Sequence, residues 1–434
     1  MLAAVALWLG RATAARADDA AAPESWSFHG QATFTEQYHL GFASPFMGAN
    51  SLDPKSDGRE TFDTTLFAGV KLWEGGEAYA NPEIDQGFGL SNSVGVAGFP
   101  SGEAYKIGKR EPYFRLQRLF FRQTFDLGGE EETVAPAANQ LGSARAANNL
   151  VITAGKIAVT DIFDTNDYAH DPRGDFLNWA VIDSGAFDYA ADSWAYTYGA
   201  AVEWTRGWWT WRGGLFDLSR GPNEANLVRG FGEYELVSEV EARTTLNERP
   251  GKIKFLAYAN RGRMADYNDA VALATRTGAV PSAALARAPA ERPGAAINAQ
   301  QEIGDGLGAF MRLSLDDGSK EAYEFTEINR SLAAGLALKG AEWGRKDDTL
   351  GAAFVINGIS KSAQTYFAAG GLGILIGDGR LPHYGTEDVL ETYYRASLMD
   401  WLSADLDYQF IANPAYNRDR GPVSFIAAQL HAQF

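Results

Sequence analysis

The chain has 434 residues, of which 46% are hydrophobic and 21% charged, with a formal net charge of −17 and no cysteine. The lack of cysteine excludes disulfide frameworks, thiolate zinc sites and thiol nucleophiles. The acidic balance argues against binding to nucleic acid, whose phosphates require clusters of Lys and Arg. The longest apolar run, Leu2 to Leu9, is far shorter than the roughly 18 residues of a membrane-spanning helix. With 25 Phe, 18 Tyr, 11 Trp and 47 Gly, the composition is typical of a large β protein, either soluble or in an outer membrane.

The first residues have features of a secretory signal peptide. A short apolar run is followed by small residues that end in Ala15-Arg16-Ala17, which matches an A-x-A cleavage pattern, although the usual basic segment at the start is missing. We therefore expect a truncated signal peptide at residues 1–17 and a mature domain at residues 18–434. The alternative is an Ala-rich N-terminus with no targeting role.

The dominant period along the rest of the chain is two residues, as expected for β-strands. Alternation of apolar and polar residues is clear in segments 62–72, 196–205, 233–241, 252–259, 402–410 and 426–434. Aromatic residues at the ends of the apolar faces, Tyr196, Trp204, Tyr408 and Phe434, suit the aromatic girdle of a membrane barrel. Alternation alone leaves open a soluble sandwich whose polar face meets solvent.

The number of alternating segments favours a closed barrel. About sixteen such segments lie between Trp26 and Phe434, an even number as bacterial barrels require, and each is expected to take about 10 residues. Turn residues at 73–76, 316–319 and 345–348 fall between alternating runs. The predicted fold is therefore all-β, a transmembrane antiparallel barrel of sixteen strands whose closure removes exposed edges.

Four long stretches of the sequence resemble the carbohydrate-selective outer-membrane porins. They are SFHGQATFTEQYH (27–39), NPEIDQGFGLSNSVGVAGFPSGEAYK (81–106), GKIAVTDIFDTNDYAHDPRGDFLNW (155–179) and LDYQFIANPAYNRDRGPVSFIAAQLHAQF (406–434). The resemblance follows nearly the whole mature chain in order. It implies a sixteen-stranded barrel that passes sugars by facilitated diffusion. The segment 264–300, rich in Ala, Arg and Pro, departs from the family pattern and is expected to form a long loop with partial helical character.

A channel for sugars needs hydrogen-bonding groups that replace water around the hydroxyls, and aromatic platforms for the C–H faces. Arg118 and Arg122 share one face of a predicted strand, opposite an acidic set that includes Glu77. Alternation predicts that thirteen residues line the lumen: Lys71, Trp73, Glu77, Asn81, Glu83, Asp85, Arg118, Arg122, Glu203, Arg212, Glu391, Arg395 and Trp401. The alternative is that these charges pair with one another and brace the wall.

The segment 161–175 is crowded with acidic residues. Asp161, Asp164, Asp167 and Asp171 could offer oxygen ligands to calcium, but their spacing matches no EF-hand loop. A polar loop at or inside the pore mouth, with Asp side chains capping its turns, is the better interpretation. We therefore predict neither a metal nor a cofactor.

The predicted function is an outer-membrane porin for monosaccharides and small oligosaccharides, without catalysis. Expected partners are carbohydrates, outer-membrane lipid and lipopolysaccharide, and the barrel-assembly machinery, which would recognise Phe434. The alternative for Phe434 is an ordinary C-terminal hydrophobe. The assembly could be a homotrimer or a monomer, and no nucleic acid is expected. The alternatives are a non-selective, cation-leaning porin, an outer-membrane or secreted carbohydrate-active enzyme, and a soluble glycan-binding β protein.

Overall fold

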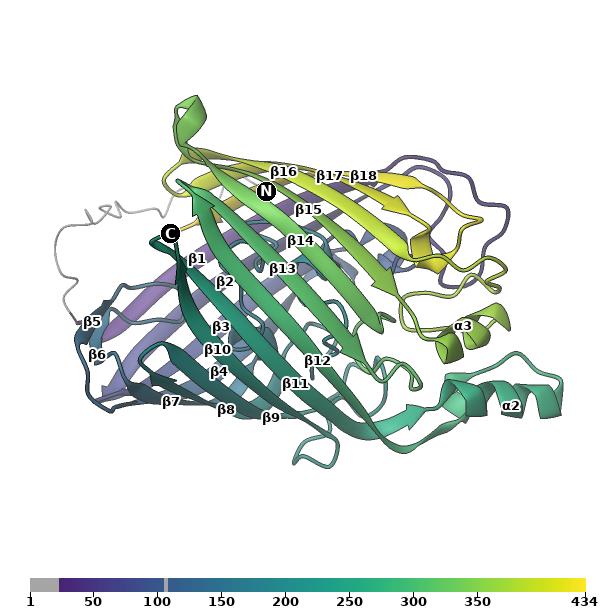
Figure 1. The fold of residues 1–434 in the computed structure, drawn as a ribbon, viewed down its shortest axis with the longest axis horizontal. Helices are drawn as coiled ribbons and strands as arrows, with labels where there is room; N and C mark the ends of the chain where they lie inside the picture. Colours follow the sequence, from purple (N-terminus) through teal and green to yellow (C-terminus); the bar gives the residue numbers. More distant parts are fainter. Residues whose placement is uncertain (1–22, 105–107) are drawn as a thin grey trace.

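Sixteen strands form one closed antiparallel barrel (Figure 1), which confirms the predicted fold class and strand count. The computed structural model describes residues 23–104 and 108–434, so the expected signal peptide at 1–17 lies outside the described residues. Each barrel strand pairs with its neighbours in sequence, except that β4 pairs with β7 because the hairpin β5–β6 forms a separate small sheet. Pairing of β1 with β18 closes the barrel.

The strands are longer than predicted in several places, reaching 18 residues in β4 and β12. The strands are β1 Trp26–His39, β2 Asp57–Trp73, β3 Gly76–Gly87, β4 Lys109–Asp126, β5 Glu131–Val134, β6 Ser143–Ala146, β7 Asn149–Ile157, β8 Thr197–Arg206, β9 Trp209–Asp217, β10 Tyr234–Leu246, β11 Arg249–Ala265, β12 Arg287–Gly304, β13 Leu307–Asp316, β14 Arg330–Gly340, β15 Arg345–Gly358, β16 Glu387–Met399, β17 Leu402–Ala412 and β18 Val423–Gln433.

Helices are few and lie in the connections. The α-helices are α1 Trp179–Ile182, α2 Tyr267–Thr277 and α3 Lys361–Ala368, and the short 3-10 helices are η1 Leu90–Ser93, η2 Val159–Asp161, η3 Ala283–Leu285, η4 Ala341–Trp343 and η5 Pro414–Tyr416. In the described part of the chain, no helix combines the length and the apolar character needed to cross a membrane.

The two ends of the barrel differ in the length of their connections. One end, here called the turn end, has short turns such as the one between β2 and β3, where Gly75 adopts a φ of 70° that other residues rarely take. The opposite end, here called the loop end, carries long connections, including helices α2 and α3 (Figure 1). In bacterial outer-membrane barrels, short turns are periplasmic and long loops extracellular.

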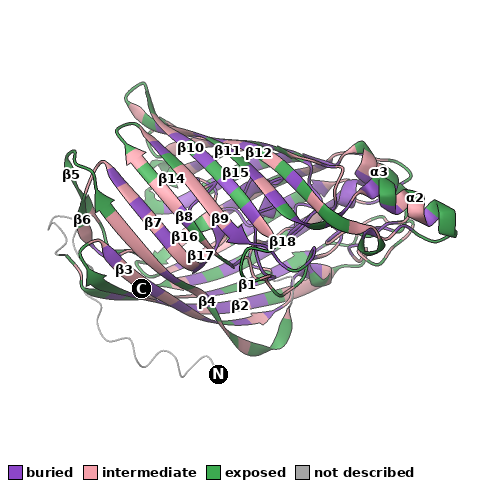
Figure 2. Ribbon diagram, turned by 90° about the horizontal axis from the view of Figure 1, so that it is seen from below, coloured by how far each residue is buried: buried purple, intermediate pink, exposed green. Residues whose placement is uncertain are grey.

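The two faces of the wall follow the predicted alternation (Figure 2). On β2, Asp63 and Thr65 are buried inside the barrel, whereas Leu66 and Val70 are exposed on the outside. Apolar side chains on the outside fit lipid, and polar side chains on the inside fit a hydrated interior. Tyr196 is an exception: it precedes β8 and is buried inside the barrel, so its assignment to the outer girdle is wrong.

Two predicted boundaries are also wrong. Of the predicted loop 264–300, residues 287–300 belong to strand β12, which pairs with both β11 and β13, and the connection contains helix α2. Asp266 caps α2 through a hydrogen bond from the Asn268 N–H, and Gly278 ends it with a φ of 69°. The predicted turn at 345–348 lies within β15, and residues 341–344 form the turn instead.

The hydrophobic core lies inside the barrel. The connection between β7 and β8, residues 158–196, here called the inserted loop, contributes buried side chains such as Phe163, Phe176 and Val181. The connection between β3 and β4 adds Phe99, whose ring stacks on Trp179 at 4.9 Å between centroids. The interior is therefore narrowed by folded chain rather than left as an open tube.

Candidate functional site

Buried side chains of the barrel wall hold the inserted loop in place. Arg312 on β13 donates hydrogen bonds of 2.7 Å to the carbonyl oxygens of Val181 and Ala169. On β16, the carboxylate of Glu391 accepts hydrogen bonds from the backbone N–H groups of Leu177 and Asn178, at 2.5 and 3.1 Å. These contacts satisfy backbone groups that would otherwise be buried without partners.

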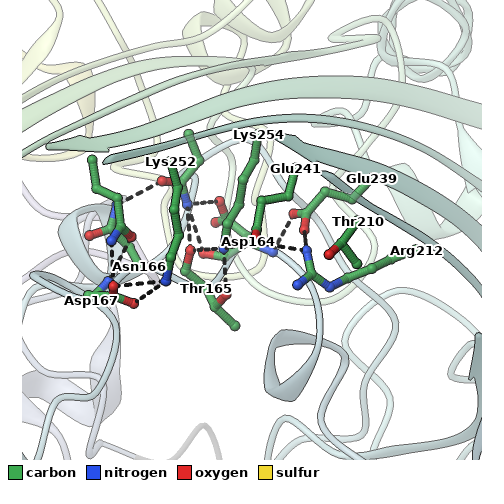
Figure 3. A network of polar contacts seen from close by, with 12 residues as sticks. Asp164, Thr165, Asn166, Asp167, Thr210, Arg212, Glu239, Glu241, Lys252 and Lys254 are labelled. Atoms are coloured by element: carbon green, nitrogen blue, oxygen red, sulfur yellow. Dashed lines mark hydrogen bonds and ion pairs between the residues drawn. The ribbon is translucent and has the colours of Figure 1, made fainter. Parts of the chain in front are cut away.

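A network of ion pairs fixes the first part of the inserted loop to strands β9, β10 and β11 (Figure 3). Arg212 lies within 2.8 Å of Glu239, 3.1 Å of Glu241 and 3.0 Å of Glu203. Glu239 in turn accepts a hydrogen bond of 2.8 Å from the backbone N–H of Asp164 in the loop. The network is therefore structural, because it connects neighbouring strands of the wall to one another and to the inserted loop.

A cavity of about 360 Å³, here called the central cavity, lies between the inserted loop and the wall formed by β3 and β4. Arg118 on β4 forms a bidentate pair with Asp161 of the loop, with N···O distances of 2.7 and 2.5 Å. Asn81 on β3 pairs with Arg118, but the next residue, Pro82, pairs with Leu116, so Gln117 is an extra residue that forms a β-bulge. The bulge lets two consecutive side chains, Gln117 and Arg118, point inward.

Aromatic rings of the loop lie beside the charged groups of the central cavity. The guanidinium of Arg115 stacks 3.4 Å from the ring centroid of Trp194, whose indole N–H donates to the hydroxyl of Tyr113 at 2.9 Å. The guanidinium of Arg118 lies 4.9 Å from the ring centroid of Tyr196. The cavity thus combines flat apolar surfaces with charged hydrogen-bonding groups.

A second segment enters the barrel from the turn end. Residues 135–142, here called the turn-end segment, connect β5 to β6 and reach Asn81 on β3. The amides of Asn81 and Asn139 bond reciprocally at 2.8 and 3.0 Å, and Arg122 donates to the Asn139 carbonyl oxygen at 2.8 Å. Asn139 also lines the central cavity, so the turn-end segment bounds this cavity on the side of the turn end.

A closed barrel with a narrowed, polar and aromatic interior is the architecture of a channel, and comparison with known proteins specifies its kind. Residues 49–434 match the family described as carbohydrate-selective porin, OprB family. The chain belongs to this family. It is a bacterial outer-membrane porin for carbohydrates, and the family is one of channels, not of enzymes.

Solved structures share the fold of this porin. The high-pH structure of Pseudomonas putida OprB matches with a TM-score of 0.70 at 17% identity, covering 94% of each chain. The low-pH structure of the same protein has a TM-score of 0.52 at 13% identity, covering 94% of this chain and 93% of that one. The channel DcaP of Acinetobacter baumannii has a TM-score of 0.53 at 9% identity, covering 94% and 97%. No curated protein matches the chain.

The structure places most of the predicted lumen residues of the porin on the inner face of the wall. The residues so placed are Glu77, Asn81, Glu83, Asp85, Arg118, Arg122, Glu203, Arg212, Glu391 and Arg395. Of these, Glu391 and Arg395 bind backbone atoms of the inserted loop. Lys71 is exposed at the turn-end mouth, where it lines a separate cavity.

Two predicted lumen residues do not line the inner wall. A bulge after Lys71 turns Trp73 outward, where its ring lies 5.5 Å from Phe121 and its N–H donates to Gln123. Trp401 lies in the turn between β16 and β17 and not in a strand. Alternation fails at both positions because a bulge or a turn interrupts the period.

Sequence reasoning missed residues that the inserted loop brings to the central cavity. Arg173 lies 3.3 Å from Glu103 and 3.4 Å from Asp63, and Trp179 and Trp194 supply rings. These residues lie outside any alternating run. The predicted polar loop at 161–175 included Arg173 but did not identify its partners, and the density of Asp and aromatic residues in 188–196 was a second local signal.

The four Asp residues considered for calcium face different partners. Asp161 pairs with Arg118, Asp164 lies 3.5 Å from Arg312, and Asp167 lies 2.8 Å from Lys252. Asp171 accepts a hydrogen bond from the backbone N–H of Arg173. Within residues 23–104 and 108–434, no three His, Cys, Asp or Glu side chains are grouped so that they could hold a metal ion.

Buried carboxyl groups of the inserted loop have raised pKa values. Burial, reinforced by the nearby Asp171, raises the pKa of Asp175 to about 7. Burial and the neighbouring Asp164 raise the pKa of Asp183 to about 7. Both groups therefore change protonation close to neutral pH.

Proposed function

We propose that monosaccharides and small oligosaccharides diffuse through this porin and bind weakly in the central cavity. The observation that carries the proposal is the placement of Trp179, Trp194 and Tyr196 beside the Arg118–Asp161 pair in one cavity of about 360 Å³. A sugar ring has apolar C–H faces and polar hydroxyl edges, and this cavity offers a partner for each.

The pairing of charges favours a neutral ligand at this point. Among the residues that line the cavity, Arg118 pairs with Asp161 at 2.5 Å and Arg173 with Glu103 at 3.3 Å, and both kinds of group keep donors and acceptors for hydroxyls. A paired site exerts little net force on a passing ion. Sugar binding there remains weak, which a channel requires because a tightly held ligand would not leave.

The test is single-channel conductance in planar bilayers with added glucose and maltodextrins. We expect the sugars to block the current, and Arg118→Ala to weaken the block about tenfold, corresponding to the loss of a charged hydrogen-bonding partner worth roughly 1.5 kcal/mol. Arg276→Ala, on helix α2 at the loop end, serves as the control and should leave the block unchanged. Conductance that is indifferent to every sugar would contradict the proposal and leave a general pore.

We also propose the partners of the outer surface. Outward apolar side chains on the strands, such as Phe255 and Leu315, would contact lipid, and the loop end would meet lipopolysaccharide. Exposed Phe434, which follows the last strand, is the candidate signal for the barrel-assembly machinery.

A further inference from the structure

The turn-end segment belongs to a long connection at the end of the barrel where connections are otherwise short. Residues 127–148 join β4 to β7, whereas residues 207–208 alone join β8 to β9, and residues 247–248 join β10 to β11. Figure 1 shows the hairpin β5–β6 at the end opposite helices α2 and α3. Ordering so many residues costs conformational entropy, so contacts must hold the connection in place.

Hydrogen bonds fix the turn-end segment at several points. The backbone N–H of Glu24 donates to the carbonyl oxygen of Gly142 at 2.8 Å, and the Glu24 carboxylate accepts from the Gly142 N–H at 2.7 Å. The N–H of Leu141, a buried side chain, donates to the hydroxyl of Tyr79 at 3.1 Å. Together with the amide pair of Asn139 described above, these contacts make the segment a fixed part of the interior.

The tip of the turn-end segment is a tight turn. The backbone N–H and carbonyl groups of Ala137 and Gln140 bond reciprocally at 3.0 Å, which leaves Ala138 and Asn139 as the tip. Asn139 has a φ of 57°, in the left-handed region that Asn adopts more readily than most residues. The closed turn therefore determines where Ala138 and Asn139 lie.

The turn-end segment lies where three cavities meet in series. A cavity of about 340 Å³, here called the turn-end cavity, is lined by β4, β7, the start of the inserted loop and the turn-end segment. It shares Ala138, Asn139 and Asp161 with the central cavity. It also shares residues, Gln140 among them, with the cavity of about 570 Å³ at the turn-end mouth where Lys71 lies. The segment thus borders both connections between cavities.

The charges around the turn-end cavity are of both signs. Its charged lining residues are Arg122, Arg145, Asp161 and Glu203. Glu77 is the cross-strand partner of Arg122. In the hairpin β5–β6, Glu132 is the partner of Arg145. Because neither sign is in excess, this passage is expected to discriminate by the space that it leaves and not by charge.

We propose that the turn-end segment forms a second constriction of the pore, which limits the size of the sugars that leave the central cavity. Ala138 and Asn139 are the specificity-determining residues, since they border the passage opposite Asp161. Monosaccharides pass this point more readily than longer oligosaccharides. The inference rests on the proposed function, because the constriction acts on sugars that have already crossed the central cavity.

The first test removes the constriction and measures the swelling of liposomes in glucose, maltose and maltotriose. Val134 and Ser143 pair across the hairpin, so replacing residues 135–142 with Asn-Gly should close β5–β6 with a two-residue turn. We expect the rate of maltotriose entry relative to glucose to rise severalfold. Heat-modifiability on gels checks that the barrel still assembles.

The second test narrows the passage without removing the segment. The chain has no cysteine, so a neutral, bulky methanethiosulfonate reacts only at an introduced thiol. We expect labelled Ala138→Cys to lose maltotriose entry and to slow glucose. Labelled Ala135→Cys is the matched control, because Ala135 is exposed in the same segment and should leave both rates unchanged. Failure of assembled Ala138→Cys to label would show that position 138 does not face the pore, which overturns the proposal.

The outcomes separate this inference from the proposed function. If the parent admits glucose and neither replacement of residues 135–142 nor labelling at position 138 changes the ratio of maltotriose to glucose entry, the constriction is overturned and the sugar pore stands. If the parent admits no sugar but the replacement variant does, the constriction is supported and the proposed function is overturned. If no form admits sugar, both fail. Should the replacement variant not assemble, the labelled Ala138→Cys channel decides.

Discussion

Single arginines organise the interior of this porin. Arg212 contacts three carboxylates from β8 and β10, and Glu239 among them is fully buried. A buried carboxylate destabilises the fold unless it is paired with a cation. Removing Arg212 should therefore lower the stability of the barrel, because the carboxylates remain buried without this partner. Lys254, 3.7 Å from Glu241, compensates only part of the loss.

We expect Arg212→Met to destabilise the barrel by about 2–4 kcal/mol, less than for a fully buried triad because Glu203 is partly hydrated. The measurement is the temperature at which the compact form converts to the slower-migrating unfolded form on gels. Arg212→Lys should lie between this variant and the parent, since it keeps the charge but loses the fork of donors. An unchanged conversion temperature in Arg212→Met would show that the network is not stabilising.

At the scale of elements, the inserted loop behaves as a unit docked on the wall. Its buried carboxyls Asp175 and Asp183 have pKa values of about 7, well above the ordinary value of 3.8. The docked loop therefore holds protons that a solvated loop releases between about pH 4 and pH 7. By linkage, these two groups stabilise docking fully below pH 4, and this contribution is lost as the pH rises through 7.

We expect hydrogen exchange of residues 158–196 to be slower at pH 5 than at pH 8 once the intrinsic pH dependence is subtracted. Asp183→Asn, which stays neutral and keeps a similar shape, should retain more of the protection at pH 8. The strands β10 and β11 provide an internal reference in the same sample. Protection of the loop that increases with pH would contradict the assignment of raised pKa values.

At the scale of the whole molecule, closure depends on the pairing of the first and last strands. The backbone N–H and carbonyl of Phe434 exchange hydrogen bonds of 2.9 Å with Gly30, and the ring of Phe434 occupies the space beside Gly30. A closed barrel leaves no unpaired edge and unfolds cooperatively, which gives such proteins their resistance to detergent.

We expect the unheated protein to migrate faster on gels than the heated protein, as a folded barrel does. Phe434→Ala keeps the closing backbone bonds but removes the proposed recognition ring, so less protein should reach the outer membrane, while the assembled fraction should still be heat-modifiable. Leu430→Ala is the control, because Leu430 is exposed on the same face of β18. Equal amounts of both variants in the outer membrane would exclude a special role for Phe434.

The sequence by itself determined the barrel and most of its inner face. Alternation is a local property of a strand, so Asn81, Glu83 and Asp85 could be assigned to the interior without knowing their neighbours. The even number of strands followed from the same pattern. Where a bulge or a turn shifted the period, as at Trp73 and Trp401, the same rule failed.

Only the tertiary structure decided how the interior is filled and which charges are compensated. Arg312 binds the carbonyl of Val181, 131 positions earlier in the chain, and no local pattern encodes such a contact. Likewise, Arg118 and Arg122 look equivalent in sequence, yet one meets Asp161 and the other a backbone carbonyl. Docking of loops depends on contacts between distant segments, and these contacts place the Arg118–Asp161 pair and its aromatic neighbours together in the lumen.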